Sequence, residues 1–505
     1  MEITQASFYL FIGLSCLIYW LIQPKFRWYV LLIDSVVFCA VNSHFSTYIF
    51  VLVNVSSVYA ATMLFGVVEN VKAKKAIVTV TLLLNVGILA YLKYLNLFID
   101  SINYVSGRFG GSVLNRVSWY APIGLSFYTL TLISYLLDTY WGVASVEKNP
   151  LKLLLYLLYF PLLVSGPILR ERETKHRLFE NVQFDHKRAV TAVRRIAWGL
   201  LKKMVVADRL ALVVSFMFSN PDLYKGLWVL IAGFAFIIEL YFDFSGCMDI
   251  IIGISACFGI ELPENFKAPF LSKTMQEFWQ RWHITLGLWL RDYIMNPILK
   301  SEPMRNLAGR CKKAFGKHGK KIPSYIAMFV LWTAMGLWHG NSWKYIVGEG
   351  WWFWLIIVLE QVLEPSMASF RKRHGLDGCK WYGLLRICRV LLLYNIGMLF
   401  FRAESLASSF EMVKNIFAPM ALRSPAAALY DNLWDGFGGL YAVIVVLFVF
   451  VLQILCDIKT YKGNSMQETV SAFPTPIRWA LYFILMLTIV VFGMFGKSAF
   501  IYFGF

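Results

Sequence analysis

His339 stands at the end of an apolar run that begins at Tyr325. Histidine accepts a proton near neutral pH, and an ionisable side chain deep in an apolar segment indicates a functional site. Gly340 follows it and permits a helix end or a close backbone approach. Trp338 and Asn341 flank this position and are candidate substrate-binding residues. The alternative is a helix-terminal histidine that only hydrogen-bonds a carbonyl group.

A second histidine, His283, ends the run Phe278–His283, in which aromatic rings alternate with a cation and the histidine. Arg281 is suited to holding an anionic group with two parallel hydrogen bonds, and Trp279 offers a ring face for stacking. The same pattern is typical of an aromatic belt at the membrane surface with an arginine that reaches toward water. Both interpretations stay open.

Two carboxylates, Asp243 and Asp249, lie in the longest apolar segment, with Ser245 between them. A buried carboxylate is costly unless it is paired, so we expect a partner such as Arg281 or water in a cavity. Asp243 and Ser245 are candidate substrate-binding residues. A purely structural ion pair is the alternative for either carboxylate.

Other kinds of catalytic site are not indicated. The histidines are isolated, with no HExxH motif, and the eight cysteines form no CxxC pair, so we predict no metal site and free thiols. Ser245 lacks the first glycine of a nucleophile elbow, and glycine-rich phosphate loops are absent.

The elements that position these residues must be apolar helices, because the chain is too hydrophobic for water. Of 505 residues, 58% are hydrophobic and 15% are charged, and the mean hydropathy is +0.60. Soluble chains carry about 25% charged residues. Apolar runs recur from Ser7 to Phe495, which predicts an all-α polytopic membrane protein. Because several runs are short, we expect about eleven transmembrane helices, plus re-entrant and interfacial helices.

The stretch from Pro263 to Pro297 is an exception, because charged residues interrupt its moderate apolar content. Irregular polar backbone at membrane depth requires cover by protein or by a water-filled cavity. We therefore expect short helices joined through Pro263, Pro269 and Pro297.

The net charge of +18 predicts orientation in a bilayer rather than nucleic-acid binding, since no nucleic-acid motif accompanies it. Basic residues cluster in short loops, and 300–321 is the most basic of them. Such loops face the cytoplasm, which leaves the N-terminus outside. We expect a multi-pass protein of the cell membrane with the lipid bilayer as its solvent.

Taken together, several short motifs resemble those of the membrane-bound O-acyltransferases. The resemblance is to the bacterial branch that includes proteins of alginate O-acetylation and of D-alanyl transfer to teichoic acids. It covers nearly the whole chain, and the order and spacing of the motifs carry it. The motifs are Pro122-Ile-Gly-Leu-Ser-Phe-Tyr, Ser165-Gly-Pro-Ile, Tyr241-Phe-Asp-Phe-Ser-Gly, Pro263-Glu-Asn-Phe, Phe278-Trp-Gln-Arg-Trp-His-Ile-Thr-Leu, Trp289-Leu-Arg-Asp-Tyr, Leu337-Trp-His-Gly and Phe500-Ile-Tyr-Phe.

The resemblance implies one catalytic domain over residues 1–505, with its motif-rich region at about 119–363. Its helices would surround a thin core with a through-membrane cavity, which the donor enters from the cytoplasm and the acceptor from outside. His339 matches the family's catalytic histidine and His283 its second characteristic histidine. After Tyr293 the sequence departs from the alginate-type pattern, which leaves the acceptor polymer open.

The function we expect is O-acyl transfer, with His339 as a general base that removes the proton from an attacking hydroxyl. The acyl group is short, with acetyl favoured, and its donor is a cytoplasmic thioester, either acetyl-CoA or a phosphopantetheine carrier protein. No bound cofactor is expected. The acceptor is an extracytoplasmic polysaccharide or cell-wall polymer, reached directly or through a partner transferase outside the membrane.

Two other functions remain open at this stage. D-alanyl transfer to teichoic acid would need a docking surface for an acidic carrier protein, and the basic segment 300–321 is the candidate. A transporter or polymer-export channel would use no thioester.

Overall fold

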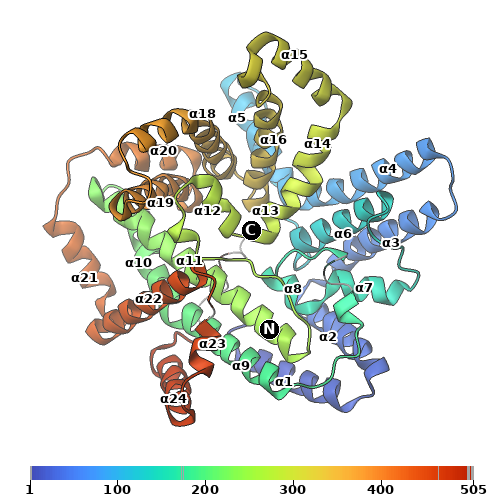
Figure 1. The fold of residues 1–505 in the computed structure, drawn as a ribbon, viewed down its shortest axis with the longest axis horizontal. Coiled ribbons are helices and arrows are strands. Elements are labelled where there is room, and N and C mark those ends of the chain that lie inside the picture. The colour runs from blue at the N-terminus through green and yellow to red at the C-terminus, as the bar shows by residue number, and fades with distance from the viewer. Residues whose placement is uncertain (1–2, 172, 174–175, 465, 497–500, 502–505) are drawn as a thin grey trace. The chain divides into compact units, whose positions relative to one another are not determined.

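The computed structural model describes residues 3–171, 173, 176–464, 466–496 and 501, and Figure 1 shows its helices. In this part of the chain all regular secondary structure is helical. The β pairing there consists of one isolated bridge between Phe266 and Trp282. The prediction of an all-α fold is therefore confirmed. Of the terminal motif that begins at Phe500, only Ile501 lies within the described residues.

The chain forms two compact units. The first comprises residues 1–199 and 247–263, and the second comprises residues 200–246 and 264–501. Helix α11 (Leu227–Cys257) contributes to both, because the boundary falls at Gly246. All of the predicted site residues belong to the second unit.

The first unit contains nine helices among its described residues besides the end of α11. They are α1 (Ala6–Leu21), α2 (Arg27–Asn42), α3 (Tyr48–Phe65), α4 (Val71–Leu89), α5 (Leu95–Arg108), α6 (Leu125–Tyr140), α7 (Pro150–Leu158), α8 (Phe160–Ser165) and α9 (His186–Leu200).

The second unit contains the start of α11 and the remaining helices. They are α10 (Asp208–Ser219), α12 (Met275–Arg281), α13 (Ile284–Leu290), α14 (Asn296–Lys300), α15 (Glu302–Gly319), α16 (Ile322–His339), α17 (Trp343–Tyr345), α18 (Trp352–Arg373), α19 (Lys380–Arg402), α20 (Leu406–Asn415), α21 (Arg423–Phe437), α22 (Gly439–Tyr461), α23 (Met466–Ser471) and α24 (Thr475–Phe492). Three π-helical segments, η6 (Leu201–Ala207), η8 (Arg291–Met295) and η9 (Ile346–Trp351), join neighbouring helices.

Seven helical segments of the described chain are long and apolar enough to cross a bilayer. This confirms a polytopic membrane protein. A total of eleven crossings stays a prediction, because it depends on shorter apolar helices such as α1. The seven segments are Phe45–Phe65, Val71–Arg108, Leu227–Cys257, Trp343–Arg373, Lys380–Arg402, Gly439–Tyr461 and Thr475–Phe492.

The polar stretch 263–297 folds into short helices, as predicted. A single 3-10 turn at Pro269–Leu271 precedes α12 and α13. Pro297 lies in the first turn of α14, directly after η8, so it stands where these two short helical segments meet.

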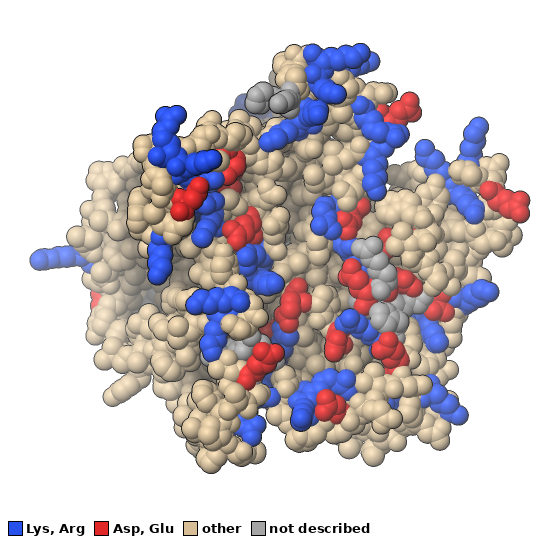
Figure 2. All heavy atoms as spheres, viewed as in Figure 1, with Lys and Arg blue, Asp and Glu red and all other residues tan. Residues whose placement is uncertain are grey.

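The basic segment 300–321 is a helix rather than an open loop, and this corrects the prediction. Helix α15 spans most of it, with a kink at Gly316, whose φ is 59°. Six basic side chains of the segment are exposed, four in α15 (Arg305, Arg310, Lys312 and Lys313) and two directly after it (Lys320 and Lys321). Figure 2 shows the blue side chains that gather over α15 at the top of the view.

Helix α12, which carries Trp279 and Arg281, is held at its start by two carboxylates. Thr274 caps the helix by accepting a hydrogen bond from the Glu277 amide at 3.1 Å, and Glu277 accepts one from the Lys273 amide at 2.9 Å. These reciprocal bonds satisfy amides that have no helical partner. From α18, Glu360 accepts a bond from the Met275 amide at 2.8 Å.

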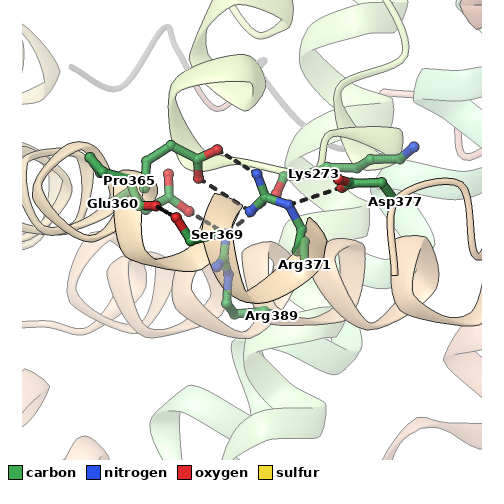
Figure 3. A network of polar contacts seen from close by, with 8 residues as sticks. Lys273, Glu360, Pro365, Ser369, Arg371, Asp377 and Arg389 are labelled. Atoms are coloured by element: carbon green, nitrogen blue, oxygen red, sulfur yellow. Dashed lines mark hydrogen bonds and ion pairs between the residues drawn. The ribbon is translucent and has the colours of Figure 1, made fainter. Parts of the chain in front are cut away.

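The same carboxylate links α12 to two further helices. Arg389 of α19 donates to Glu360 at 2.5 Å and to the Lys273 carbonyl at 3.3 Å. Figure 3 shows Glu360 and Arg389 beside a second network, in which Arg371 pairs with Asp377. Arg371 also pairs with Glu364. The N-terminus of α12 is thus fixed to α18 and α19.

Candidate active site

His339 is the last residue of α16, and its side chain is buried. The ring of Phe401, from α19, lies edge-on to the imidazole with a centroid distance of 5.4 Å. The Glu349 carboxylate, from η9, lies 3.9 Å from His339 Nε2. The predicted proton acceptor therefore has a carboxylate in its immediate surroundings.

His283 lies between α12 and α13 in a left-handed backbone conformation, with φ 47° and ψ 52°. Backbone bonds from Lys267 to Arg281 and from Ile284 to Asn265 pair the segments on either side of it. The buried Asn265 side chain accepts bonds from the Thr285 amide and hydroxyl, both at 3.0 Å. These contacts fix the backbone that presents His283.

Asn265 also sets the proton position on His283. Its carbonyl oxygen already takes two bonds from Thr285, so its amide nitrogen, 3.1 Å from His283 Nδ1, acts as the donor. We therefore assign Nδ1 as the acceptor and Nε2 as the nitrogen that carries hydrogen. Burial lowers the pKa of His283 well below 6.5, and the nearby His339 lowers it further. His283 is a neutral imidazole.

Arg281 is engaged by residues of its own chain. Its guanidinium pairs with Glu277 at 3.1 Å, donates to the Lys267 carbonyl at 3.1 Å and stacks over the Tyr461 ring at 4.5 Å. Trp279, two residues earlier in α12, packs between the rings of Trp332 and Phe353, each at 5.0 Å.

Asp243 is paired with Lys203 rather than with Arg281, which corrects the expected partner. The two charged atoms lie 2.6 Å apart, and Lys203 also contacts Asp208 at 2.9 Å. The Ile501 amide donates to the second oxygen of Asp243 at 2.9 Å. Asp249, in the first unit, pairs with Arg195 at 3.0 Å. Asp243 is buried and Asp249 is half-buried, and each is paired with a cation.

The other predicted binding residues differ in exposure. Ser245 is buried and accepts a bond from Lys202 at 3.3 Å. Trp338 is also buried, whereas Asn341 is exposed in the turn after α16. Lys344, which follows in α17, is buried and donates to the carbonyls of Phe401 and Ala403 at the end of α19. Basic side chains often satisfy the last carbonyls of a helix in this way.

The structure brings some predicted residues together but not others. His283 and His339 are close enough for one to affect the charge of the other, and Phe244, beside Asp243 in sequence, packs edge-on to His283 at 4.8 Å. Sequence reasoning missed Lys203 and Glu349. Both are charged residues within apolar runs, which is the signal that had identified the histidines.

Comparison with known proteins finds one matching family and several relatives. The model of the membrane-bound O-acyltransferase family matches residues 143–308, a range that includes His283. The probable alginate O-acetylase AlgI of Pseudomonas putida is 30% identical over 421 residues, which cover 81% of this chain and 79% of that protein.

Two relatives with other names align over shorter ranges. The peptidoglycan O-acetyltransferase of Helicobacter pylori is 27% identical over 364 residues, covering 66% of this chain and 63% of that protein. The teichoic acid D-alanyltransferase of Bacillus subtilis is 32% identical over 231 residues, covering 45% of this chain and 55% of that protein.

Proposed function

The chain belongs to the membrane-bound O-acyltransferase family and is an O-acyltransferase, and on that premise we propose its reaction. It transfers a short acyl group, acetyl, from a cytoplasmic thioester to hydroxyl groups of an extracytoplasmic polysaccharide or cell-wall polymer. Relatives named for O-acetylation of alginate or peptidoglycan support both the acetyl group and the polymer. The acceptor is reached directly or through a partner transferase outside the membrane.

The observation that carries this proposal is the buried His339 at the end of α16, with the neutral His283 nearby in the same unit. His339 acts as general base and takes the proton of the attacking hydroxyl. The neutral His283 shapes the site and contributes no charge of its own. Holding a thioester and a hydroxyl in contact supplies much of the rate, because the two react poorly when they meet at random.

The remaining site residues are proposed to bind substrate. Backbone amides or the positive charge of Arg281 stabilise the oxyanion, and Trp279 and Trp338 offer apolar surface. Asp243 and Ser245 act with their lysine partners, and Asn341 contacts the acceptor. The donor is acetyl-CoA or an acyl-loaded phosphopantetheine carrier. The protein works in the bacterial cytoplasmic membrane, with its N-terminus outside.

Turnover by the purified protein tests this proposal. Full-length protein in detergent is mixed with acetyl-CoA, or with an acetyl-loaded carrier protein, and with a hydroxyl-bearing polymer. We expect release of free thiol together with acetyl ester on the polymer, measured by a thiol reagent and by mass spectrometry. A transporter or export channel would consume neither donor, so an intact thioester in every mixture would contradict the proposal.

A second candidate, D-alanyl transfer from a carrier protein, is favoured by one specific observation. Helix α15 and the two residues after it expose six basic side chains along a continuous segment, a surface complementary to an acidic carrier. The Bacillus subtilis relative carries that activity in its name. Parallel reactions with a D-alanyl-loaded carrier separate the two candidates, because each donor leaves a different mass on the acceptor.

A further inference from the structure

Glu349 is a carboxylate that the structure pairs with His339. Its side chain is 1% exposed, and its second oxygen, Oε1, has no hydrogen-bond partner in the described chain. A buried carboxylate oxygen without a partner is costly, and such groups are concentrated where they serve a function. The unpartnered oxygen therefore indicates that Glu349 has a functional role and not only a packing role.

The backbone holds Glu349 close to His339 by direct helix contact. A Cβ at Gly336 of α16 would lie 2.7 Å from the Ile346 Cα, and one at Gly350 of η9 would lie 2.8 Å from the Trp332 carbonyl oxygen. Only glycine allows the two backbones to approach this closely. The π-helical turn of η9 adds a residue to the turn that carries Glu349, a form often found at functional sites.

The other charged and titratable groups around this pair come from three further elements. His283 lies on the His339 side, and Tyr345 lies within electrostatic range of both Glu349 and Arg402. Lys344 is taken by the carbonyls of Phe401 and Ala403, and Arg402 donates to Ser215 at 3.1 Å. None of these cations forms an ion pair with Glu349 among the residues described.

We propose that Glu349 is a positioning residue that orients the His339 imidazole and stabilises the imidazolium formed during acyl transfer. The inference rests on the proposed function of His339 as general base. In that step the acceptor oxygen forms a bond to the thioester carbonyl carbon, and His339 takes the hydroxyl proton. The carbon–sulfur bond then breaks, and the imidazolium returns the proton to the departing thiolate sulfur. Glu349 offsets the positive charge that His339 carries between these two events.

The distance of 3.9 Å is longer than a hydrogen bond, and this suits a contact that tightens when the imidazole becomes charged. The alternative is that Glu349 is a neutral acid retained for packing. The two roles differ in one measurable property. A charged partner changes how readily His339 becomes protonated, whereas a packing residue does not.

Glu349→Gln tests the inference because it keeps the shape and removes the charge. We expect kcat to fall by roughly 10- to 100-fold, the size of loss seen when carboxylate partners of metal-binding histidines are removed, with little change in the KM of the thioester. The acid limb of the kcat–pH profile should move to lower pH, since the protonated imidazole loses its charge partner. Glu349→Asp, which keeps the charge, should recover part of the activity.

The matched control is Glu364→Gln, which removes an exposed carboxylate from the neighbouring helix α18. It should leave both kcat and the pH profile at parental values. Melting temperature and elution as a single particle in detergent show whether each variant is folded. If folded Glu349→Gln has the parental kcat and pH profile, the inference is wrong.

A comparison with His339→Ala separates this inference from the proposed function. Loss of transfer in His339→Ala together with parental behaviour in Glu349→Gln overturns only the role of Glu349. Parental transfer in His339→Ala overturns the proposed function itself. If Glu349→Gln does not fold, Glu349→Asp decides, because its shorter side chain holds the carboxylate farther from the imidazole. An acid limb displaced to lower pH supports charge coupling, and a parental kcat with a parental acid limb contradicts it.

Discussion

The Lys203 ammonium lies 2.6 Å from the Asp243 carboxylate, and both side chains are buried in the second unit. Lys203 also contacts Asp208, so one lysine neutralises two carboxylates. Removing one partner of a buried ion pair costs more than the pair contributes, because an uncompensated charge is left behind.

Lys203→Met should therefore destabilise the protein more than Asp243→Asn. The first change strands two carboxylates, whereas the second leaves Lys203 still paired with Asp208. We expect a cost of about 3–5 kcal/mol for Lys203→Met. The double variant Lys203→Met with Asp243→Asn should be less destabilised than the sum of the two. Melting temperatures in detergent measure all three, and equal losses in the two single variants would contradict the shared-lysine arrangement.

His339→Ala should abolish most acyl transfer while the protein still inserts and purifies as a single particle. General base catalysis contributes roughly 10²- to 10⁴-fold, and we expect a loss of at least this size. Thiol release with donor and acceptor present is the measurement. The control is His374→Ala, which removes an exposed histidine of the same unit. Near-parental transfer would leave His339 as a structural helix-end residue.

The buried neutral His283 makes stability depend on pH. Burial lowers its pKa in the folded protein, whereas the unfolded chain has the ordinary value of about 6.5. The unfolded state then binds more protons than the folded state at low pH. The free energy of unfolding is therefore highest above a pH of about 6.5 and falls as the pH drops below that value. His283→Asn, which does not titrate and tolerates a left-handed backbone, should flatten this dependence. Melting temperatures at several pH values test it, and an unchanged slope in the variant would argue against the assignment.

Arg281→Lys keeps the charge and loses the planar fork. The guanidinium contacts Glu277 and the Lys267 carbonyl at the same time, which an ammonium cannot do with the same geometry. We therefore expect a lower rate of acyl transfer and a lower melting temperature at normal membrane abundance. An arginine that merely reaches toward water would tolerate lysine. Turnover equal to the parent would therefore favour the aromatic-belt interpretation.

The orientation in the membrane can be read by cysteine labelling after the native cysteines are removed. A cysteine at Ser46 should react with an impermeant thiol reagent from outside, and one at Ala314 in α15 should not. Both positions are exposed, so a lack of reaction reports on the side of the membrane and not on burial. The reverse pattern would place α15 outside and remove it as a carrier-docking surface.

The sequence predicted the features that depend on composition and local spacing. Apolar runs predicted the helices, and an ionisable residue in an apolar run identified His339 and His283. Pairing across the chain was not predictable in this way. Asp243 was known to need a partner, but Lys203 lies 40 residues away, and either it or Arg281 satisfied the same requirement.

Glu349 shows the same limit from another direction. It occupies an apolar run, so the rule that identified His339 applied equally to it. Its distance from His339, however, depends on the π-helical turn of η9 and on two glycine contacts, and neither has a periodicity that can be read from residue types. The helical state of 300–321 was missed because its charge density was interpreted as a solvated loop.

The left-handed backbone conformation at His283 limits the types of residue that natural variation can place at this position. Most side chains resist this conformation, and glycine, asparagine and aspartate accept it most readily. Residue 283 therefore meets two separate requirements, a left-handed backbone conformation and an imidazole side chain. A library that samples only residue 283 should return few folded members beyond those three and the parent, while paired changes at Asn265 widen the set.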